Sequence, residues 1–383
     1  MKPLRKVLIS IDWFVPGFKA GGPIQSCANL VAHLKGEFEF YIITRNTDYV
    51  STEQYPGITA NTWHQIEPGV QVYYFSADNL NFQNVKKVLR GVQADVIYIN
   101  GIFSRFFSIY TLLIARSSKM KVIVAARGMF APSAVNVKND KKKLFFLVAK
   151  AVGLYNKVTF HASNLTEVEH IRAILGDKIQ VSVASNLPKI LNTNTPFPTI
   201  KKEQGKLKLV SVARVSPEKN TKYALEVLSN YVYEGQIEFT IFGPVYDAKY
   251  WEVCEAIITS LPSNISVIYE GSLDSKHVPA ALQEHHVLFL PTRGENFGHI
   301  ILESLSAGLP VLISDKTPWL DLQEKHVGYD LPLAEPTRFK EAITVLLALK
   351  QEEYDEMSAS VRSFAAHYVA DTSIVAANRA LFS

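Results

Sequence analysis

Residues 291–319 read PTRGENFGHIILESLSAGLPVLISDKTPW, and this stretch predicts a loop, a helix, a tight Gly-Leu-Pro turn and a buried strand. Glu295 lies in the loop, and Glu303 lies on the helix eight positions later. A helix that begins just after a glycine, here Gly298, presents free backbone N–H groups and a positive dipole end to an anion. Two carboxylates beside such an anion site suit a ligand with both hydroxyl and phosphate groups, such as a nucleotide-sugar.

Composition is that of an ordinary globular protein. The chain has 383 residues, which fits two domains, with 48% hydrophobic and 20% charged residues. A net charge of +4 permits an anionic ligand but is too small to indicate nucleic-acid binding. The two cysteines, Cys27 and Cys254, stand in unlike contexts and support neither a disulfide framework nor a zinc site.

The N-terminal run MKPLRKVLISIDWF is apolar only as far as Asp12. It predicts a first strand rather than a signal peptide, and no run reaches the length of a transmembrane helix. We therefore expect a cytoplasmic protein, soluble or peripheral on the inner face of a membrane.

Apolar runs alternate with helical patterns along the whole chain, which is typical of α/β folds with parallel sheets. The first series of strand-like runs covers residues 6–11, 39–43, 70–75, 96–99, 122–125, 158–161 and 181–184. The second covers residues 207–213, 237–242, 265–269, 287–290 and 311–314.

These series predict two Rossmann-like domains. We expect an N-terminal domain over residues 1–186, a proline- and threonine-rich linker over 187–206 and a C-terminal domain over 207–357. A helical tail over 358–383 is expected to pack back on the N-terminal domain. The carboxyl ends of both sets of strands can then face a shared cleft, where ligands of open α/β sheets bind.

Two further loops bear on the ligand. Arg214 and Lys219 follow the strand that opens the second series, where an Arg fork and a Lys point charge could clamp a diphosphate. Gly21 and Gly22 lie in the loop between the first strand and the first helix. This loop lacks the G-x-G-x-x-G spacing of a dinucleotide fingerprint.

The pattern Glu295-(seven residues)-Glu303, preceded by Arg214 and Lys219, resembles retaining glycosyltransferases of the GT-B fold, specifically glycosyltransferase family 4. The segments SDKTPW at 314–319, AARGM at 125–129 and HASNLTEVEHIR at 161–172 are similar to members that build bacterial surface polysaccharides. This resemblance implies transfer of a sugar from a nucleoside-diphosphate donor, UDP- or GDP-linked, to a glycan or lipid-linked glycan. It also implies that no cofactor or metal is needed, in agreement with the lack of any Asp-x-Asp sequence.

What the resemblance implies for residues can be stated one position at a time. Glu295, Arg214 and Lys219 are the catalytic candidates: Glu295 would lie against the donor sugar while the two cations hold the diphosphate. Glu303 would accept hydrogen bonds from the ribose hydroxyls. The remaining donor-binding candidates are backbone groups around Asn296, Phe297 and Gly298, together with Gly21 and Gly22, where the absence of a Cβ lets the loop approach the ligand.

The acceptor side departs from the family pattern. Members commonly have His-Gly where this chain reads Asn100-Gly101, and asparagine cannot titrate near neutral pH. The change removes a candidate general base. Arg127 and His161, each at the end of a predicted strand, are further acceptor-side candidates.

Residues 138–157 read KNDKKKLFFLVAKAVGLYNK, a basic amphipathic pattern. Such a helix can lie on an anionic membrane surface, and it can equally be a domain helix with a solvated lysine face.

Two alternative functions stay open from the sequence. The same fold serves nucleotide-sugar epimerases, which need no acceptor. The Asn100 change could also mark a non-catalytic, sugar-nucleotide-binding subunit of an assembly complex, although the retained Arg214 and Lys219 weigh against that reading.

Overall fold

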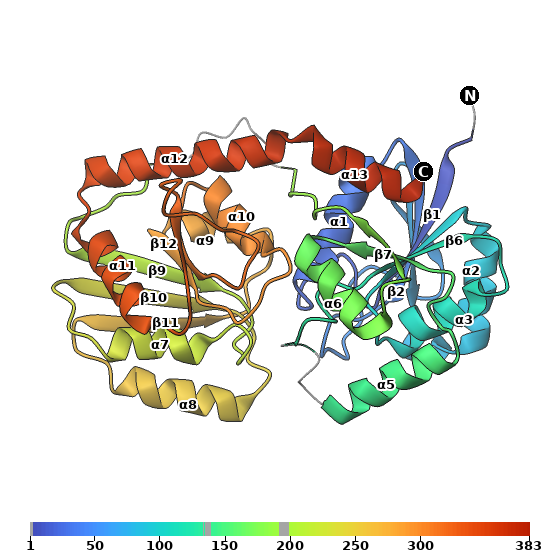
Figure 1. Cartoon of the computed structure of the whole chain (residues 1–383), viewed down its shortest axis with the longest axis horizontal. Coiled ribbons are helices and arrows are strands. Elements are labelled where there is room, and N and C mark those ends of the chain that lie inside the picture. The colour runs from blue at the N-terminus through green and yellow to red at the C-terminus, as the bar shows by residue number, and fades with distance from the viewer. Residues whose placement is uncertain (1–2, 133, 135–138, 191–198) are drawn as a thin grey trace. The chain divides into compact units, whose positions relative to one another are not determined.

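The computed structural model describes residues 3–132, 134, 139–190 and 199–383. The chain forms two compact units, each with its own sheet (Figure 1). Unit 1 comprises Met1–Ile190 together with Thr372–Ser383, and unit 2 comprises Leu191–Asp371.

The sheet of unit 1 has the strand order β3-β4-β2-β1-β5-β6-β7-β8 among the described residues. Its neighbouring strands pair in parallel, except that β3 pairs antiparallel with β4. The strands are β1 (Arg5–Ser10), β2 (Phe38–Arg45), β3 (Trp63–Glu67), β4 (Val70–Phe75), β5 (Val96–Asn100), β6 (Lys121–Ala125), β7 (Thr159–Ala162) and β8 (Gln180–Val183). The helices are α1 (Gly22–Leu34), η1 (Ala77–Asn79), α2 (Phe82–Val92), η2 (Arg105–Tyr110), α3 (Thr111–Ala115), α5 (Asn139–Ala151), α6 (Leu165–Leu175) and α13 (Thr372–Phe382).

The sheet of unit 2 is parallel throughout its described strands, in the order β11-β10-β9-β12-β13-β14. The strands are β9 (Lys206–Val212), β10 (Gln236–Phe242), β11 (Ile265–Gly271), β12 (Val287–Leu290), β13 (Val311–Ser314) and β14 (Gly328–Leu331). The helices are α7 (Thr221–Ser229), α8 (Ala248–Thr259), α9 (Val278–Gln283), α10 (His299–Ser306), α11 (Pro336–Ala348) and α12 (Gln351–Ala370).

Both faces of the unit 2 sheet are buried, which explains its continuous apolar runs. In β12, Val287 and Phe289 belong to one hydrophobic cluster, while Leu288 and Leu290 belong to another. Successive side chains of a strand point to opposite faces. Each face must therefore be apolar, since each is covered by helices. The α/β class and the two Rossmann-like domains predicted from the sequence are confirmed.

Two strands escaped the sequence reading, and both are at sheet edges. The side chains of β3 are exposed or only partly buried, so its sequence WHQIE shows no apolar run. The edge strand β14, with sequence GYDL, is buried only at its two ends. Neither strand therefore has the continuous apolar run of the buried central strands.

The predicted linker and tail can be compared with the unit boundaries. Residues 191–198 of the predicted linker lie outside the described residues. The predicted tail spans the C-terminal part of α12 and the whole of α13, and these helices belong to different units. α12 packs in unit 2, where Val361 and Ala365 join the core, whereas α13 lies on unit 1, where the Phe382 ring contacts those of Phe38, Phe40 and Tyr98.

None of the helices in the described part of the chain is long and apolar enough to cross a membrane.

Candidate functional site

In each sheet, strands that follow one another in the chain are added first on one side of the first strand and then on the other side. The point between these two series is the switch point, and it locates the candidate site of each unit. In unit 2 the order reverses between β9 and β12, and in unit 1 between β1 and β5. The loops at the carboxyl ends of such strand pairs diverge, and ligands of open α/β sheets bind there. The predicted residues Arg214, Lys219 and Glu295 follow β9 or β12, while the Gly21-Gly22 loop and Asn100 follow or end β1 and β5.

Hydrogen bonds tie the two switch-point loops of unit 2 together. Thr292 Oγ1 donates to the Glu218 carbonyl at 3.1 Å, and the Arg293 amide donates to the same carbonyl at 2.8 Å. Asn220 Nδ2 donates to the Pro291 carbonyl at 3.0 Å. The loop after β9 therefore lies against the loop after β12, which brings residues distant in sequence into one place.

This arrangement pairs Lys219 with Glu295. The Lys219 ammonium donates to Glu295 Oε1, and the two side chains are only 18% and 13% exposed. The Glu295 amide also donates to the Lys316 carbonyl at 3.0 Å, which fixes the loop that carries the carboxylate. The pair is thus held between two loops, close enough to the surface for a ligand to reach it.

Arg214 lies two residues beyond the end of β9 and is partly buried. Its side chain makes no hydrogen bond or ion pair with any residue that the structure describes. A partly buried guanidinium without a partner keeps its donors for a ligand, and carboxylate and phosphate oxygens are the groups it matches best.

The start of α10 supplies backbone donors. Gly298 caps the helix with φ +77°, a left-handed conformation that favours glycine, and a Cβ there would lie 2.7 Å from Ile301 Cδ1. The N–H groups of Phe297 and Gly298 donate to no acceptor among the described residues. The Phe297 ring packs against Trp319 and is 6% exposed, so only its backbone can serve a ligand.

Asn296 and Glu303, the other predicted donor residues in unit 2, are both partly buried. Asn296 lies in the loop that carries Glu295, and Glu303 lies on α10. Each also makes an interaction inside the protein.

The glycine loop of unit 1 ends at α1. Gly21 caps this helix with φ +70°, Gly22 is its first residue, and both are exposed. A Cβ built on Gly21 meets nothing within 4 Å, so the backbone conformation rather than close packing within the chain requires glycine here. These two glycines lie at the switch point of unit 1.

The three acceptor-side candidates belong to one buried network. Arg127 Nε donates to Asn100 Oδ1 at 2.8 Å, and its Nη2 donates to the Tyr98 hydroxyl at 2.9 Å. Its Nη1 donates to Asn186 Oδ1. Arg127 itself has φ +53°, which is uncommon for a residue other than glycine. One cation thereby joins the ends of β5, β6 and β8.

His161 is the far end of this network and is neutral. Its Nε2 lies 2.7 Å from the Ala184 carbonyl, which can only accept, so Nε2 carries the proton. Its Nδ1 therefore accepts from the Tyr98 hydroxyl at 2.7 Å. Burial and the Arg127 cation lower the pKa of His161 to about 3. Both ring nitrogens are occupied, and the imidazole is 2% exposed.

Sequence reasoning did not single out Tyr98, Asn186 or Asn220, which hold these loops in place. Tyr98 lies in the middle of an apolar strand, so only its hydroxyl hinted at a buried polar partner. Asn220, with φ +62°, follows Lys219 directly before α7, and an asparagine at a helix start is a signal that could have found it.

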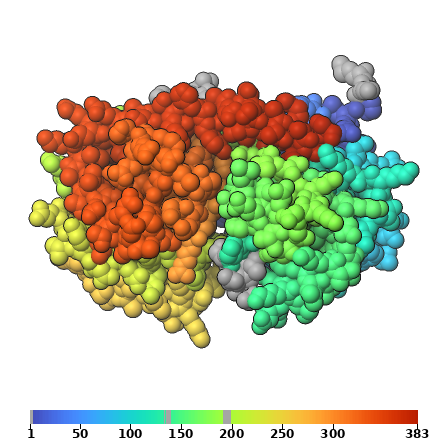
Figure 2. All heavy atoms as spheres, in the orientation of Figure 1, coloured from blue at the N-terminus to red at the C-terminus, as the bar shows by residue number. Residues whose placement is uncertain are grey.

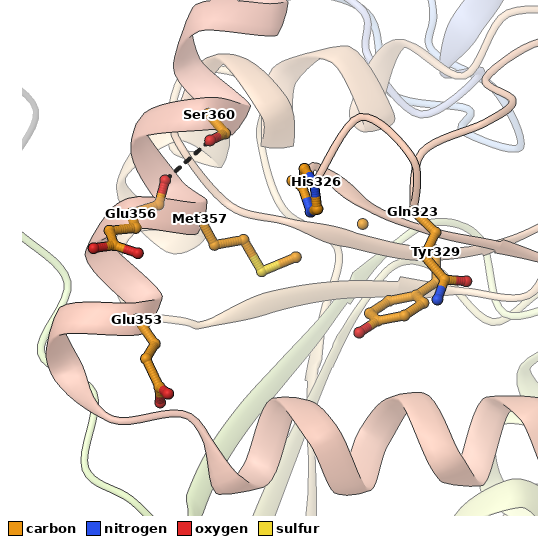
Figure 3. Close-up of a pocket in the computed structure, with 8 residues that line it drawn as sticks. Gln323, His326, Tyr329, Glu353, Glu356, Met357 and Ser360 are labelled. Carbon is orange, nitrogen blue, oxygen red and sulfur yellow. Dashed lines mark hydrogen bonds between the residues drawn. The ribbon is translucent and has the colours of Figure 1, made fainter.

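A pocket of about 510 Å³ lies beside β14, an edge strand of the unit 2 sheet (Figure 3). It is bordered by His326 and Gln323, before β14, and by Glu353, Glu356 and Met357 of α12. Its two glutamates do not suit a diphosphate. Among the described residues, no group of three or more His, Cys, Asp or Glu side chains could hold a metal ion.

Comparisons with known proteins bear on the family and the fold. Residues 193–364 match the family described as Glycosyl transferases group 1, which covers most of unit 2. An uncharacterized 41.2 kDa protein in the cps region of Klebsiella pneumoniae is 24% identical over 242 residues, 61% of this chain and 64% of that protein. The chain thus spans less than two thirds of this curated relative.

Solved structures extend the likeness to the whole chain. Sucrose-phosphate synthase from Thermosynechococcus elongatus has a TM-score of 0.68 at 14% identity, with 99% of this chain and 98% of that chain covered. Anabaena HepE in complex with UDP and glucose also has a TM-score of 0.68, at 12% identity, with 98% of each chain covered. The structural likeness shows the GT-B fold, and together with the family match it supports a glycosyltransferase.

Proposed function

We propose that this protein is a retaining glycosyltransferase that moves a sugar from a nucleoside diphosphate to a glycan or lipid-linked glycan in surface-polysaccharide biosynthesis. One observation carries the proposal: the switch-point loops of unit 2 hold the Lys219–Glu295 pair, and the loop after β9 also carries Arg214, which has no partner among the described residues. Two cations, a carboxylate and free amides at a helix start are what a sugar diphosphate requires. HepE was solved with UDP and glucose, which favours a UDP-sugar as the first donor to test.

In this proposal the protein stabilises the leaving group without a metal ion. Arg214 and Lys219 place two positive charges on the diphosphate as the bond to the sugar breaks. Glu295 orients the sugar, and Glu303 accepts from the ribose. The departing phosphate takes the proton of the acceptor hydroxyl, and the new bond forms on the face from which the phosphate leaves. Neither carboxylate then serves as the paired acid or base of a glycoside hydrolase.

Donor binding can be tested without knowing the acceptor. UDP-, GDP-, ADP- and dTDP-sugars should be compared for the rise in melting temperature that each produces, because a ligand that binds the native state stabilises it by mass action. We expect one nucleotide class to raise the melting temperature clearly above the others. No rise with any donor would refute the proposal.

Lys219→Ala and Glu295→Ala test the catalytic assignment. Each should lower sugar transfer by about 100-fold or more while the protein stays folded, since loss of one group that stabilises developing charge has effects of this size. Lys222→Ala is the matched control, because Lys222 forms an exposed pair with Glu226 at 3.2 Å on α7. Wild-type turnover by Lys219→Ala would contradict the assignment. Sugar conversion without any acceptor would favour the epimerase alternative.

The acceptor proposal includes a membrane surface, and α5 provides the observation for it. Leu144, Leu147 and Val148 of α5, and Val152 directly after it, are each at least half exposed, whereas Phe146 and Ala149 are buried in the core of unit 1. Spacings of three and four residues place the exposed set on one side of the helix, away from the core. Figure 2 shows this stretch, in blue-green, on the outside of unit 1.

Charge on α5 complements an anionic bilayer. The helix carries four lysines and one aspartate, and Lys141, Lys143 and Lys150 are exposed. Lys142 instead donates to the Ala134 carbonyl. An apolar stripe bordered by lysines is typical of helices that lie in the headgroup region. Residue 138, the first of the segment predicted from sequence, lies outside the described residues.

Vesicle sedimentation tests this surface. The protein should bind vesicles of phosphatidylglycerol more strongly than vesicles of phosphatidylcholine, and the double variant Leu144→Ser/Leu147→Ser should lose about 10-fold or more in binding. Leu113→Ser is the control, because Leu113 is exposed elsewhere in unit 1. Equal binding by the double variant and the wild type would remove α5 from the proposal.

A further inference from the structure

Asp12 lies just beyond β1, at the switch point of unit 1, and has no role in the sites described so far. Its carboxylate contacts Arg45, the last residue of β2, and Ser104, in the loop after β5. These three strands are neighbours in the order β2-β1-β5. A charged residue therefore follows the apolar N-terminal strand, at the carboxyl edge of the sheet, where ligands of open α/β sheets bind.

The two oxygens of this carboxylate have different surroundings. Oδ1 accepts from Ser104 Oγ at 2.9 Å, from Arg45 Nη2 at 3.2 Å and from Arg45 Nε at 3.4 Å. Oδ2 accepts from no group in the described part of the chain. Oδ2 is not fully buried, and the Asp12 side chain is 19% exposed. One oxygen is thus fixed by the protein, and the other faces solvent.

The surroundings hold this carboxylate rigidly. The Arg45 guanidinium carbon lies 5.7 Å from the centroid of the Trp13 ring, 5.4 Å from that of Phe106 and 5.5 Å from that of Phe107. Ser104 caps η2, a π-helix, and π-helical turns are frequent at functional sites. Burial raises the pKa of the Asp12 carboxyl, while Ser104 and Arg45 act in the opposite direction.

A purely structural ion pair does not explain this geometry. A carboxylate that served only Arg45 could offer both oxygens to the guanidinium fork, which is the strongest arrangement of such a pair. Here Arg45 Nε, Arg45 Nη2 and the Ser104 hydroxyl all donate to Oδ1. That asymmetry keeps the lone pairs of Oδ2 for a donor from outside the chain.

We propose that Asp12 binds a hydroxyl group of the acceptor sugar through Oδ2, with the half-buried rings of Trp13 and Phe106 bordering the sugar. The inference rests on the proposed glycosyltransferase function and names the group that recognises the acceptor. Because Oδ2 can only accept hydrogen bonds, it selects a hydroxyl and repels a carboxylate or phosphate. Aromatic rings offer the apolar surface that the C–H face of a pyranose requires.

The test compares transfer with hydrolysis in Asp12→Asn. This variant keeps an oxygen for Arg45 and Ser104 but replaces Oδ2 by an NH₂ group that cannot accept. The donor is UDP-glucose, and the acceptor is whichever of octyl β-glucoside, octyl β-galactoside and octyl β-mannoside gives the wild type its highest rate. Asp78→Asn, an exposed carboxylate on η1, is the matched control.

We expect Asp12→Asn to lower kcat/KM for the octyl glycoside by about 100-fold. Hydrolysis of UDP-glucose without acceptor and the melting-temperature rise with UDP should match those of the wild type. Unimpaired transfer by Asp12→Asn would overturn the inference, as would an equal loss of transfer, hydrolysis and UDP stabilisation. A wild type that UDP and GDP leave unstabilised would instead refute the proposed function, so the two failures can be told apart.

Discussion

Arg127 and Arg214 stand at the same distance from the end of a strand, and the structure gives them opposite surroundings. Each lies two residues beyond the end of a parallel strand, β6 in unit 1 and β9 in unit 2. The Arg127 guanidinium donates to Asn100, Tyr98 and Asn186, whereas Arg214 has no partner among the described residues. Position after a strand therefore does not decide whether an arginine serves the fold or a ligand. The partners of its donors decide.

The same contrast separates the acceptor-side and donor-side candidates. In unit 1, the Tyr98 hydroxyl accepts a hydrogen bond from Arg127 and donates one to His161. The polar atoms of these residues therefore hold loops together. In unit 2, the Lys219–Glu295 pair lies near the surface beside amides without acceptors. The candidate donor residues thus keep polar groups for a ligand, whereas the polar groups of the unit 1 network bond to one another.

Replacing each arginine by alanine should give the largest effects. Arg127→Ala should change the free energy of unfolding, and Arg214→Ala should change the rate of sugar transfer. Arg127→Ala leaves three buried acceptors without their donor and should lower the free energy of unfolding by about 3 kcal/mol or more. Arg214→Ala should leave stability within about 0.5 kcal/mol and lower sugar transfer by about 100-fold. Urea unfolding and transfer rates measured on both variants check this. Similar profiles for the two variants would abolish the contrast.

The acid sensitivity of unit 1 should trace to His161. Its pKa is lowered to about 3 in the folded protein from an ordinary value of 6.5, so the unfolded chain binds the proton more readily. This contribution to stability is fully present above pH 6.5 and is lost as the pH falls toward 3. His161→Gln, which can still donate to Ala184 and accept from Tyr98, should show a shallower fall in unfolding free energy between pH 6.5 and 4.

The control for this titration is His367→Gln, because His367 is exposed on α12. It should keep the wild-type pH profile. A His161→Gln profile identical to that of the wild type would show that other groups cause the acid sensitivity.

Replacing the glycines that cap α1 and α10 by alanine should give the smallest effects. The two losses of stability show which helix start depends more on its glycine. Gly21→Ala meets the backbone strain of φ +70° and ψ −131°, a cost of about 1–3 kcal/mol, but its Cβ has open space. Gly298→Ala adds the contact at 2.7 Å with Ile301 Cδ1 and should lower the melting temperature further. A larger loss from Gly21→Ala would show that backbone strain at Gly21 outweighs the side-chain contact at Gly298.

Much of the fold could be predicted because buried parallel strands have strong sequence patterns. The runs at residues 70–75, 287–290 and 311–314 coincide with the observed strands β4, β12 and β13. β3 and β14 could not be found in this way, since edge strands are covered less and need no continuous apolar run. The packing of the C-terminal tail could not be predicted either, because the helical periodicity of α12 and α13 does not say which unit each helix covers.

The sequence by itself determined the two α/β domains, because local periodicity can be read along the chain, and the chemistry of Glu295, Arg214 and Lys219 predicted a donor site. Only the tertiary structure decided which donors and acceptors meet. Strand order brings the loop after β9 against the loop after β12, and it directs one oxygen of Asp12 to solvent while Arg127 and His161 are enclosed. Hydrogen-bond partners depend on distances between segments far apart in sequence, and no local pattern encodes those distances.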